Sequence, residues 1–338
     1  MRSIVYERNG PASVLQLVER DQDELTEGEV RVRVVVSGVN PTDWKIRSGL
    51  TGSTDTRSVP NQDGAGVVDA VGPGVSGLAV GDRVWLALAA FERPLSGTAQ
   101  EYTVVPAERV FPLPSEASFD VGATLGVPAL TAHRALTVTE GAPDRLRPGA
   151  LHGVTVLVAG GAGAVGHAAI QLARWAGADV IATVSGPEKA ALATAAGAQH
   201  VVNYHDADAV EQIRGIAPGG VDTIVEVAAG ANAALDLAVL RPAGTIAVYA
   251  NDGGVPLELD VRAYMTLNVR LQFVLLYTVP PGALAAGAED VVAAISALPV
   301  GADAGLPLHR FPLDRTADAH AAVEAGAIGK VLIDVAHE

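Results

Sequence analysis

Hydrophobic and polar positions alternate with a period of two near the start of the chain. From Glu29 to Val36, valines at every second position alternate with charged residues, which is typical of a half-buried β-strand. Residues 64–71 and 82–88 predict two more strands, and the turns between them are rich in glycine and proline. We therefore expect the first 125 residues to form a partly closed, antiparallel β region.

From about residue 126 the pattern changes to alternating strands and helices. The predicted strands are short apolar runs at 154–158, 179–184, 201–202, 221–227, 245–249 and 269–277. Predicted helices at 164–176 and 187–196 follow the first two strands. Alternation in this order implies an α/β fold with a doubly wound parallel sheet.

The last part of the chain predicts a helix near 289–298 and a strand at 330–335. We expect this part to return to the first domain. The expected division is therefore a Rossmann domain over 126–276 and a discontinuous, mainly β domain formed by 1–125 and 277–338. The strand at 269–277 is long, apolar and expected at the sheet edge, where an identical strand of a second copy could pair with it. A homodimer is expected, with a covered edge in a monomer as the alternative.

A glycine cluster lies between the first predicted strand and helix of the Rossmann domain. Gly161, Gly163 and Gly166 fit the G-x-G-x-x-G pattern in this context, where the glycines allow a tight turn, close approach of a pyrophosphate and close packing of helix on strand. The helix start adds unpaired N–H groups and a positive dipole end. The turn therefore predicts dinucleotide binding at six residues, namely Gly161, Ala162, Gly163, Ala164, Val165 and Gly166.

The end of the second strand of this domain selects the nucleotide. A carboxylate there would bind the ribose 2′-hydroxyl of NAD and repel the 2′-phosphate of NADP. This strand ends in Thr-Val-Ser-Gly without an acid, and Lys189 follows Ser185 by four residues. Tyr204, after the next strand, is placed to cover the adenosine end of the cofactor site. Hydroxyls and a lysine favour a phosphate, so NADPH is the predicted cofactor. The alternative for Lys189 is a solvated helix lysine.

Composition excludes several function classes. The 338 residues include 23 basic and 38 acidic side chains, which give a net charge of −15. Such a surface repels phosphate backbones and anionic lipids, so no nucleic acid or membrane partner is expected. The chain has no cysteine, which rules out disulfides, thiolate nucleophiles and cysteine-ligated zinc. No apolar run spans a membrane, and the first residues lack the apolar core of a signal peptide. A cytoplasmic location is therefore expected.

Several motifs in order resemble the medium-chain dehydrogenase/reductase superfamily and, within it, the zinc-free quinone oxidoreductases related to zeta-crystallin. The resemblance covers essentially the whole chain, and it implies a GroES-like fold for the mainly β domain. Besides the glycine turn, the motifs lie at 38–41, 46–49, 63–68, 71–72, 80–84, 128–136 and 329–333.

The resemblance also bears on metal binding. Alcohol dehydrogenases of this superfamily place a zinc-ligating cysteine where this chain has Asn40, and Gly-His-Glu where residues 61–63 are Asn-Gln-Asp. No metal is therefore expected. Without a Lewis acid the oxidation of an alcohol is difficult, so substrates that accept hydride readily are favoured, namely quinones or alkenes conjugated to a carbonyl.

Position by position, the resemblance implies two groups of site residues. The catalytic group comprises Asn40, Asp43, Trp44, Lys45 and Thr131. Besides the glycine turn, the cofactor contacts comprise Ser185, Lys189, Tyr204, Asn232, Tyr249, Ala250, Asn251, Val274, Leu275, Leu276 and Lys330.

One position departs from the family pattern, because relatives commonly carry a tyrosine where this chain has Lys45. Lys45 either points at the substrate as a cationic donor or turns to solvent while Trp44 fills the space. Asp43 either positions the substrate or pairs with an arginine inside its domain.

The resulting function hypothesis is zinc-independent hydride transfer from NADPH to a quinone or similar conjugated carbonyl acceptor. The enzymatic alternative is an enoyl reductase that acts on α,β-unsaturated ketones or thioesters. The alternative of another class is a non-catalytic NADPH-binding protein.

Overall fold

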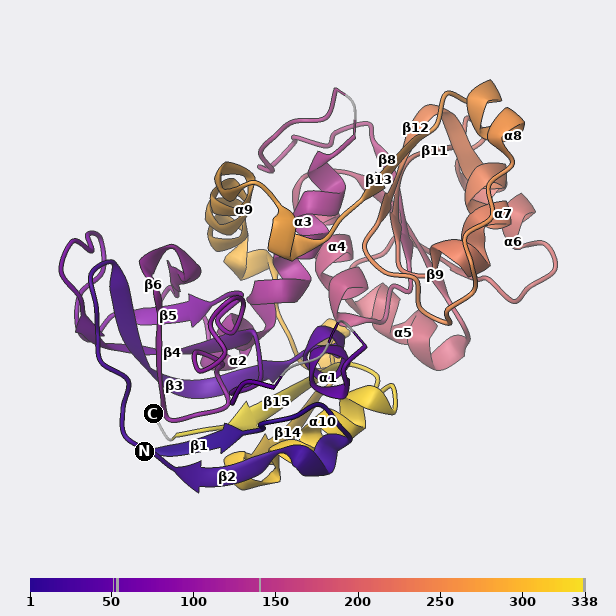
Figure 1. Cartoon of the computed structure of the whole chain (residues 1–338). Helices are drawn as coiled ribbons and strands as arrows, with labels where there is room; N and C mark the ends of the chain where they lie inside the picture. Colours follow the sequence, from indigo (N-terminus) through magenta and orange to yellow (C-terminus); the bar gives the residue numbers. More distant parts are fainter. Residues whose placement is uncertain (51, 53–54, 140, 337–338) are drawn as a thin grey trace. The chain divides into compact units, whose positions relative to one another are not determined.

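The computed structural model describes residues 1–50, 52, 55–139 and 141–336 (Figure 1). The chain divides into two compact units. Met1–Val127 and Pro307–Glu338 form the first unit, and Pro128–Leu306 forms the second.

The first unit is built on a mixed sheet that contains seven strands in the described part of the chain. Its order is β14-β15-β3-β4-β5-β7, with β6 paired to β3, and only β14 and β15 are parallel neighbours. The strands are β3 (Glu29–Val39), β4 (Asp63–Val71), β5 (Arg83–Leu86), β6 (Tyr102–Pro106), β7 (Val110–Pro112), β14 (Leu308–Pro312) and β15 (Lys330–Asp334). A separate hairpin pairs β1 (Arg2–Val5) with β2 (Gln16–Glu19), and the helices are α1 (Pro41–Ser48), α2 (Phe119–Thr124) and α10 (Thr316–Glu324).

The alternating valines of β3 explain why this strand is central. Val30 and Val32 belong to one buried cluster, whereas Val34 and Val39 belong to another. All four are nearly inaccessible to solvent, while Arg31 and Arg33 are only partly covered. The period-two prediction is therefore confirmed, and the strand extends beyond its predicted end at residue 36.

The second unit contains a parallel sheet with six described strands in the order β10-β9-β8-β11-β12-β13 (Figure 1). The strands are β8 (Thr155–Ala159), β9 (Asp179–Val184), β10 (His200–Asn203), β11 (Val221–Glu226), β12 (Leu240–Val248) and β13 (Arg270–Phe273). Counted along the chain this is the order 3-2-1-4-5-6, which is typical of the Rossmann fold. The predicted doubly wound parallel sheet is confirmed.

Helices connect the strands of this sheet, as expected for crossover connections. The connecting helices are α4 (Ala164–Trp175), α5 (Pro187–Ala195), α6 (Ala209–Ile216), α7 (Ala229–Val239) and α8 (Val261–Thr266). In addition, α3 (Leu130–Thr137) precedes the first strand of the sheet and α9 (Pro281–Ala293) follows the last. Among the described residues, no helix combines the length and hydropathy needed to cross a bilayer.

Two elements near the end of this unit differ from the expectation. The strand expected at 269–277 lies at the sheet edge but ends at Phe273, because its neighbour β12 ends at Val248, whose carbonyl accepts the last ladder bond from the Val274 backbone N–H at 2.8 Å. The helix expected near 289–298 begins earlier, at Pro281, since proline is well suited to the first helical position.

The return to the first unit lies at Pro307, later than the expected residue 277. The reason is that α9 packs on α3 within the second unit. The Asp290 carboxylate of α9 accepts hydrogen bonds from the His133 ring at 2.8 Å and from the Leu146 backbone N–H at 2.7 Å. These buried contacts keep residues 277–306 with the parallel sheet.

Candidate functional site

The glycine turn joins β8 to α4 in the second unit. Gly160 directly follows the strand with a positive φ of 67°, and Gly163 is the N-cap of α4. The backbone N–H groups of Gly160 and Gly161 both donate to the Thr183 carbonyl at 3.1 Å. The turn is thereby fastened to the end of β9. Gly160 was not among the predicted residues, although its position immediately after an apolar strand is a usable signal.

The three predicted glycines have different structural roles. A Cβ on Gly166 would lie 2.4 Å from the Gly160 carbonyl oxygen, and a Cβ on Gly161 would lie 2.8 Å from Ala182 Cβ. These two positions require glycine so that helix and strand can pack closely. Gly163 is exposed, and a Cβ there would meet only the Gly160 carbonyl oxygen at an ordinary 3.4 Å. Glycine at 163 is therefore not needed for packing, but it leaves the outer surface of the turn open.

The open turn fits the pyrophosphate of a dinucleotide. Ala164, Val165 and Gly166 are the first three residues of α4, and helix geometry leaves their N–H groups without a partner in the helix. Ala162 is buried beneath the turn. A surface without side chains, unpaired N–H donors and the positive end of a helix dipole together form an anion-binding site.

The other cofactor residues predicted in this unit lie on the same edge of the sheet as the turn. All strands are parallel, so their carboxyl ends share one edge, where ligands bind in folds of this kind. The residues beyond these ends are Ser185 after β9, Tyr204 after β10, Tyr249, Ala250 and Asn251 after β12, and Val274, Leu275 and Leu276 after β13. The helices that follow two of the strands carry Lys189 and Asn232.

The corner formed by β9 and β10 fits a phosphate group. The Tyr204 backbone N–H donates to the Val184 carbonyl at 3.1 Å, which places Tyr204 beside Ser185. Lys189 is half-buried on α5 and makes no ion pair with any residue that the structure describes. The tip of β9 carries no acid that would repel a 2′-phosphate.

The two asparagines on this edge are engaged within the protein. Asn232 Nδ2 donates to Glu226 Oε1 at 2.9 Å. Asn251 Oδ1 accepts from the Gly230 N–H at 2.9 Å, and its Nδ2 donates to the Val255 carbonyl at 2.8 Å. Their side chains therefore shape the loops after β11 and β12.

A pair of buried acids lies behind Asn232 and was not predicted. Glu226 ends β11, and Asp236 lies on α7. Burial raises the pKa of Glu226, and burial together with the nearby Glu226 raises the pKa of Asp236 well above its usual value. The usable sequence signal is an acid that follows the apolar pair Ile224 and Val225 at the end of a predicted buried strand.

The remaining predicted residues of this unit differ in exposure. Val274 and Leu276 are buried, whereas Leu275 is 57 % exposed. Tyr249 is half-buried at the end of β12, and burial raises the pKa of its hydroxyl. Thr131 is buried on α3.

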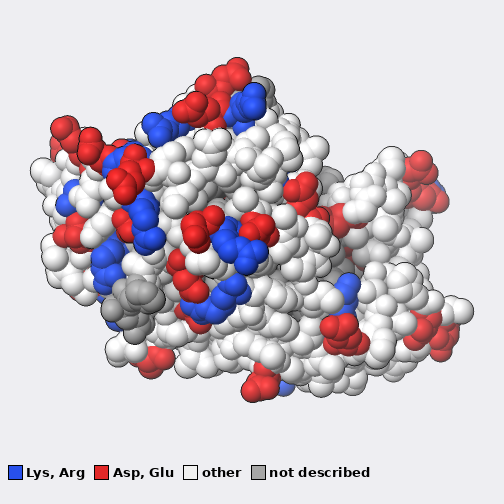
Figure 2. All heavy atoms as spheres, turned by 90° about the horizontal axis from the view of Figure 1, so that it is seen from below, with Lys and Arg blue, Asp and Glu red and all other residues white. Residues whose placement is uncertain are grey.

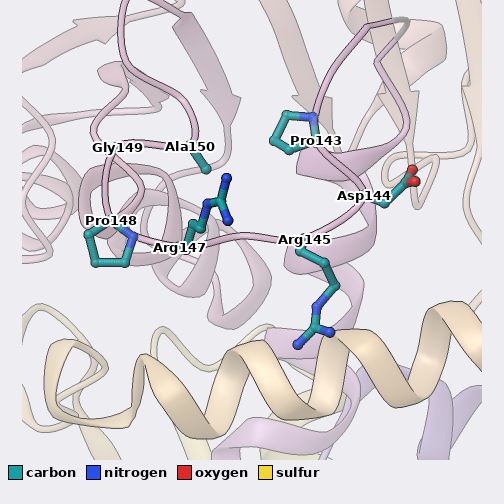
Figure 3. Close-up of a pocket in the computed structure, with 7 residues that line it drawn as sticks. All are labelled: Pro143, Asp144, Arg145, Arg147, Pro148, Gly149 and Ala150. Atoms are coloured by element: carbon teal, nitrogen blue, oxygen red, sulfur yellow. The ribbon is translucent and has the colours of Figure 1, made fainter.

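A separate hollow in the second unit is lined by the loop that precedes β8 (Figure 3). Arg145 points from this loop toward a helix, and it pairs with Asp290 and Glu289 of α9. The hollow includes none of the predicted site residues. Its lining residues are Pro143, Asp144, Arg145, Arg147, Pro148, Gly149 and Ala150.

In the first unit, a polar cluster brings together the start of α1 and the start of β4. The Asn40 backbone N–H donates to Asp43 Oδ2 at 2.7 Å, and the Gln62 backbone N–H donates to Asp43 Oδ1 at 3.1 Å. Asp43 is 3 % exposed, and its two oxygens thereby join the two elements. Asp43 is thus bonded by backbone N–H groups, and Arg47 instead pairs with Glu324 at 2.7 Å.

A fully buried ion pair completes the cluster. Lys330 Nζ lies 3.4 Å from Asp63 Oδ2, and both side chains are at most 1 % exposed. The Asn40 carboxamide bridges the two charges, since its Oδ1 accepts from Lys330 Nζ at 2.6 Å and its Nδ2 donates to Asp63 Oδ2 at 2.7 Å. The Val127 backbone N–H donates to the other Asp63 oxygen at 2.8 Å.

The charges of this cluster perturb one another. Burial, and then the neighbouring Asp63, raise the pKa of Asp43 to about 7. Burial also raises the pKa of Asp63, although Lys330 opposes the effect. Burial lowers the pKa of Lys330, and the two aspartates oppose this. Two acids and one ammonium are neutral together when they hold one additional proton, and Asp43 is the group poised to hold it near pH 7.

The structure therefore brings together three predicted residues, Asn40, Asp43 and Lys330, and adds Asp63. Sequence reasoning used Asp63 as part of a strand motif and in the comparison with Gly-His-Glu, but not as a site residue, although an acid that begins a nearly apolar strand is a signal. Trp44 and Lys45 are half-buried on α1, with Lys45 Nζ 5.9 Å from the centre of the Trp44 ring. Within the described ranges, no group of three or more His, Asp or Glu side chains is arranged to hold a metal ion.

Comparison with known families and sequences matches both units. Residues 26–115 match the alcohol dehydrogenase GroES-like domain, and residues 164–296 match a domain described as zinc-binding dehydrogenase. The chain is 32% identical to a quinone oxidoreductase of Lama guanicoe over 98% of its own length and 97% of the relative's. It is 30% identical to the human quinone oxidoreductase over 90% of its own length and 88% of the relative's.

Solved structures show the same similarity. A mycobacterial quinone oxidoreductase superimposes with a TM-score of 0.83 and 30% identity over 98% of this chain and 99% of that one. The Escherichia coli quinone oxidoreductase, solved in complex with NADPH, gives a TM-score of 0.82 and 26% identity over 99% and 100% of the two chains. A 2-haloacrylate reductase gives a TM-score of 0.81 and 27% identity over the full length of both.

Proposed function

Because the chain belongs to the quinone oxidoreductase family of the medium-chain dehydrogenases/reductases, we propose that it transfers hydride from NADPH to a quinone or a similar conjugated carbonyl acceptor. The observation that carries the proposal is the open glycine turn on the carboxyl edge of a Rossmann sheet, with a lysine and no acid at the 2′-phosphate corner. NADPH supplies the hydride when it is bound.

The cofactor residues have distinct roles in this proposal. The turn at 162–166 binds the pyrophosphate through the N–H groups of Ala164, Val165 and Gly166 at the start of α4. Ser185, Lys189 and Tyr204 bind the 2′-phosphate. The backbone of residues 249–251 and 274–276 binds the nicotinamide ribose and the carboxamide, while the Asn232 and Asn251 side chains hold the loops in place. Thr131, Asn40 and Lys330 flank the nicotinamide.

The polar cluster around Lys330 orients the reacting groups. Asn40 Nδ2 donates one of its two hydrogens to Asp63, so the other is the one that would reach a ligand, while Oδ1 accepts from Lys330 and caps α1. Asp43 fixes the start of α1, and in this proposal the half-buried Trp44 and Lys45 of the same helix contact the acceptor. Solvent protonates the product.

The donor set of this cluster also supports zinc independence. An amide, a carboxylate and a buried ammonium stand together, and Lys330 Nζ is only 2.6 Å from Asn40 Oδ1. A positive charge at this position repels a divalent cation. The chain also has no cysteine that could serve as a zinc ligand in place of these groups.

A single assay tests the proposed function. NADPH oxidation is followed with a panel of quinones, enones and enoyl thioesters, with NADH in place of NADPH as the cofactor control and a chelator as the metal control. Turnover with quinones that prefers NADPH and resists the chelator is expected. Binding of NADPH without turnover on any acceptor would instead indicate a non-catalytic protein.

A second candidate function is the reduction of alkenes conjugated to a carbonyl group. The similarity to a 2-haloacrylate reductase over the full chain favours it, and it requires the same cofactor site. If enones or enoyl thioesters are reduced while quinones leave NADPH unchanged, this second function is the correct one.

We also propose a homodimer through the sheet edge at 269–277. β13 is an edge strand, and four large apolar side chains around it, Val261, Met265, Phe273 and Leu275, are each more than half exposed. A shallow hollow in the same region is lined by Leu259, Val261, Tyr264, Met265, Asn268, Val269 and Leu271. Sedimentation should give the mass of two chains, and Phe273→Asp should give the mass of one; a wild-type mass of one chain contradicts the dimer.

A cytoplasmic location and a small-molecule partner complete the proposal. Figure 2 shows acidic and basic side chains interspersed on the visible face among wide uncharged areas, and the chain carries a net charge of −15, which is unsuited to binding nucleic acid or anionic membranes. The absence of cysteine suits a reducing compartment.

A further inference from the structure

We infer that His320, acting through Asn61, is a positioning residue that holds Asp63 against Lys330 and Asn40. The inference rests on the proposed function for its kinetic consequence. It begins with the backbone of Asn61, which has a positive φ of 80° at a position that is 1 % exposed. A non-glycine residue in this conformation needs specific support from its surroundings, and asparagine is among the residues that tolerate it best.

The turn at Asn61 aims the next two residues at the cluster. The Gln62 backbone N–H donates to Asp43 Oδ1, and Asp63 begins β4 with its carboxylate at Asn40 and Lys330. A change in the turn would therefore move both connections at once.

A chain of buried hydrogen bonds fixes this turn. Thr98 Oγ1 donates to the Asp63 carbonyl at 2.5 Å, so the Ser37 hydroxyl, 2.6 Å from Thr98 Oγ1, must donate to Thr98. Asn61 Nδ2 donates to Ser37 Oγ at 2.9 Å. The remaining group of Asn61 is its carbonyl Oδ1, which lies 2.8 Å from His320 Nε2 and must accept from it.

This directionality assigns the state of His320. Nε2 carries the hydrogen, and Nδ1 is buried without a partner among the described residues, so a doubly protonated ring would leave one N–H unpaired. Burial, and then the charge of Arg47, lower the pKa of His320 to about 3. The imidazole is therefore a constant neutral donor at every pH at which the enzyme would work.

The position of His320 in the fold explains why it reaches the cluster. It lies on α10, which the Glu324–Arg47 ion pair fastens to α1, and β15 with Lys330 follows α10 directly. The C-terminal segment thus supplies both Lys330, which is the ammonium of the cluster, and His320, which is the hydrogen-bond donor that supports the turn leading to Asp63.

The test compares His320→Leu with His320→Gln, which keeps a side-chain N–H donor. Loss of one buried hydrogen bond should lower kcat/KM for the quinone about tenfold in H320L, with an unchanged Kd for NADPH, and H320Q should recover most of it. His309→Leu is the matched control, because His309 is exposed and donates to the Ile328 carbonyl in the same unit. A folded H320L with wild-type kcat/KM overturns the inference.

A second variant and a second readout cover the other outcomes. Asn61→Gly keeps the positive φ without strain but deletes both side-chain bonds, so it should fold even if H320L does not and should show the same kinetic loss. Carbon-13 NMR titration of the aspartates needs no turnover: the Asp43 titration near pH 7 should shift in N61G and stay in H309L. If the wild-type protein turns over and the variants change neither kcat/KM nor the Asp43 titration, the positioning role is refuted. If the wild-type protein does not turn over but the Asp43 titration shifts in N61G, only the proposed function is refuted.

Discussion

The glycine turn of the second unit and the polar cluster of the first unit reach their chemistry by different routes. The turn uses backbone groups of one continuous stretch, 160–166, and its ligand would meet N–H donors at a helix start. The cluster uses side chains from three distant segments, near residues 40, 63 and 330, and every one of them is buried. The backbone site of the glycine turn is encoded by one short stretch of sequence. The polar cluster depends instead on several charges, from distant parts of the chain, that compensate one another.

The largest expected effect is the loss of stability when the buried charge of Lys330 is removed from the polar cluster, since the glycine turn has no such charge. Lys330→Met leaves Asp63 and Asp43 buried without their cation, and breaking a buried pair from one side costs about 3–5 kcal/mol. Urea unfolding at pH 7.5 should show a loss of about that size, together with loss of activity. The double variant K330M/D63N, which removes both charges, should recover most of the stability. An unfolding free energy of K330M within about 1 kcal/mol of wild type would mean that the cluster is not held by charge.

The second prediction concerns the pH dependence of the cluster. The folded-state pKa of Asp43, about 7, lies above its ordinary value of 3.8, so between these pH values the folded chain holds a proton that the unfolded chain releases. The stabilisation is complete below about pH 4 and is lost as the pH rises through about 7, by about 4 kcal/mol at most. Asp43→Asn should reduce the slope by this contribution in unfolding experiments across the range, and Asp63, Glu226 and Asp236, whose pKa values are also raised, should supply the slope that is left.

The groups that face Asp43 define the control for this slope. They are the carboxylate of Asp63, the ammonium of Lys330 and the backbone N–H groups of Asn40 and Gln62. Asp82 is an exposed carboxylate that also accepts a backbone N–H, from Ala79 at 2.8 Å. Asp82→Asn should leave the slope in place, and a slope in D43N as steep as in the wild type would assign it to other groups.

The same contrast explains how much the sequence could predict. Strand period, glycine spacing and the missing acid after β9 are local features, and the structure confirms the Rossmann sheet that they indicated. Asp63 was missed because its partners Asn40 and Lys330 are distant in sequence and only the sheet order β15-β3-β4 brings them together. The same holds for His320 and Asn61, whose hydrogen bond joins α10 to the turn before β4.

The ends of strands and domains were the other features that the sequence could not predict. The strand expected at 269–277 stops at Phe273 because its neighbour β12 ends, which apolar character alone does not reveal. The boundary near residue 277 moved to Pro307 because the His133–Asp290 contact joins α9 to α3, and that contact spans residues far apart in the chain.

The third prediction sharpens the contrast within the glycine turn itself. Gly163→Ala adds a Cβ with only an ordinary 3.4 Å contact, so stability should stay within about 0.5 kcal/mol of wild type. The methyl group covers the open surface, so the Kd for NADPH should rise at least about tenfold. Gly166→Ala is the matched variant, since its Cβ would lie 2.4 Å from the Gly160 carbonyl oxygen and should cost about 1–3 kcal/mol of stability. Equal NADPH affinity in G163A and wild type would place the pyrophosphate elsewhere.

The smallest expected effect tests whether side-chain charge adds to the backbone site. Lys189 is half-buried beside Ser185 and makes no ion pair with any described residue, so Lys189→Glu should weaken NADPH binding about tenfold more than NADH binding. The excess arises because only NADPH carries the 2′-phosphate that the new carboxylate repels. Glu188→Gln, on the exposed neighbouring residue, should change both affinities little. Titration calorimetry with the two reduced nucleotides measures the difference, and equal losses for both in K189E would remove Lys189 from the phosphate site and leave nucleotide selection to Ser185, Tyr204 and the acid-free end of β9.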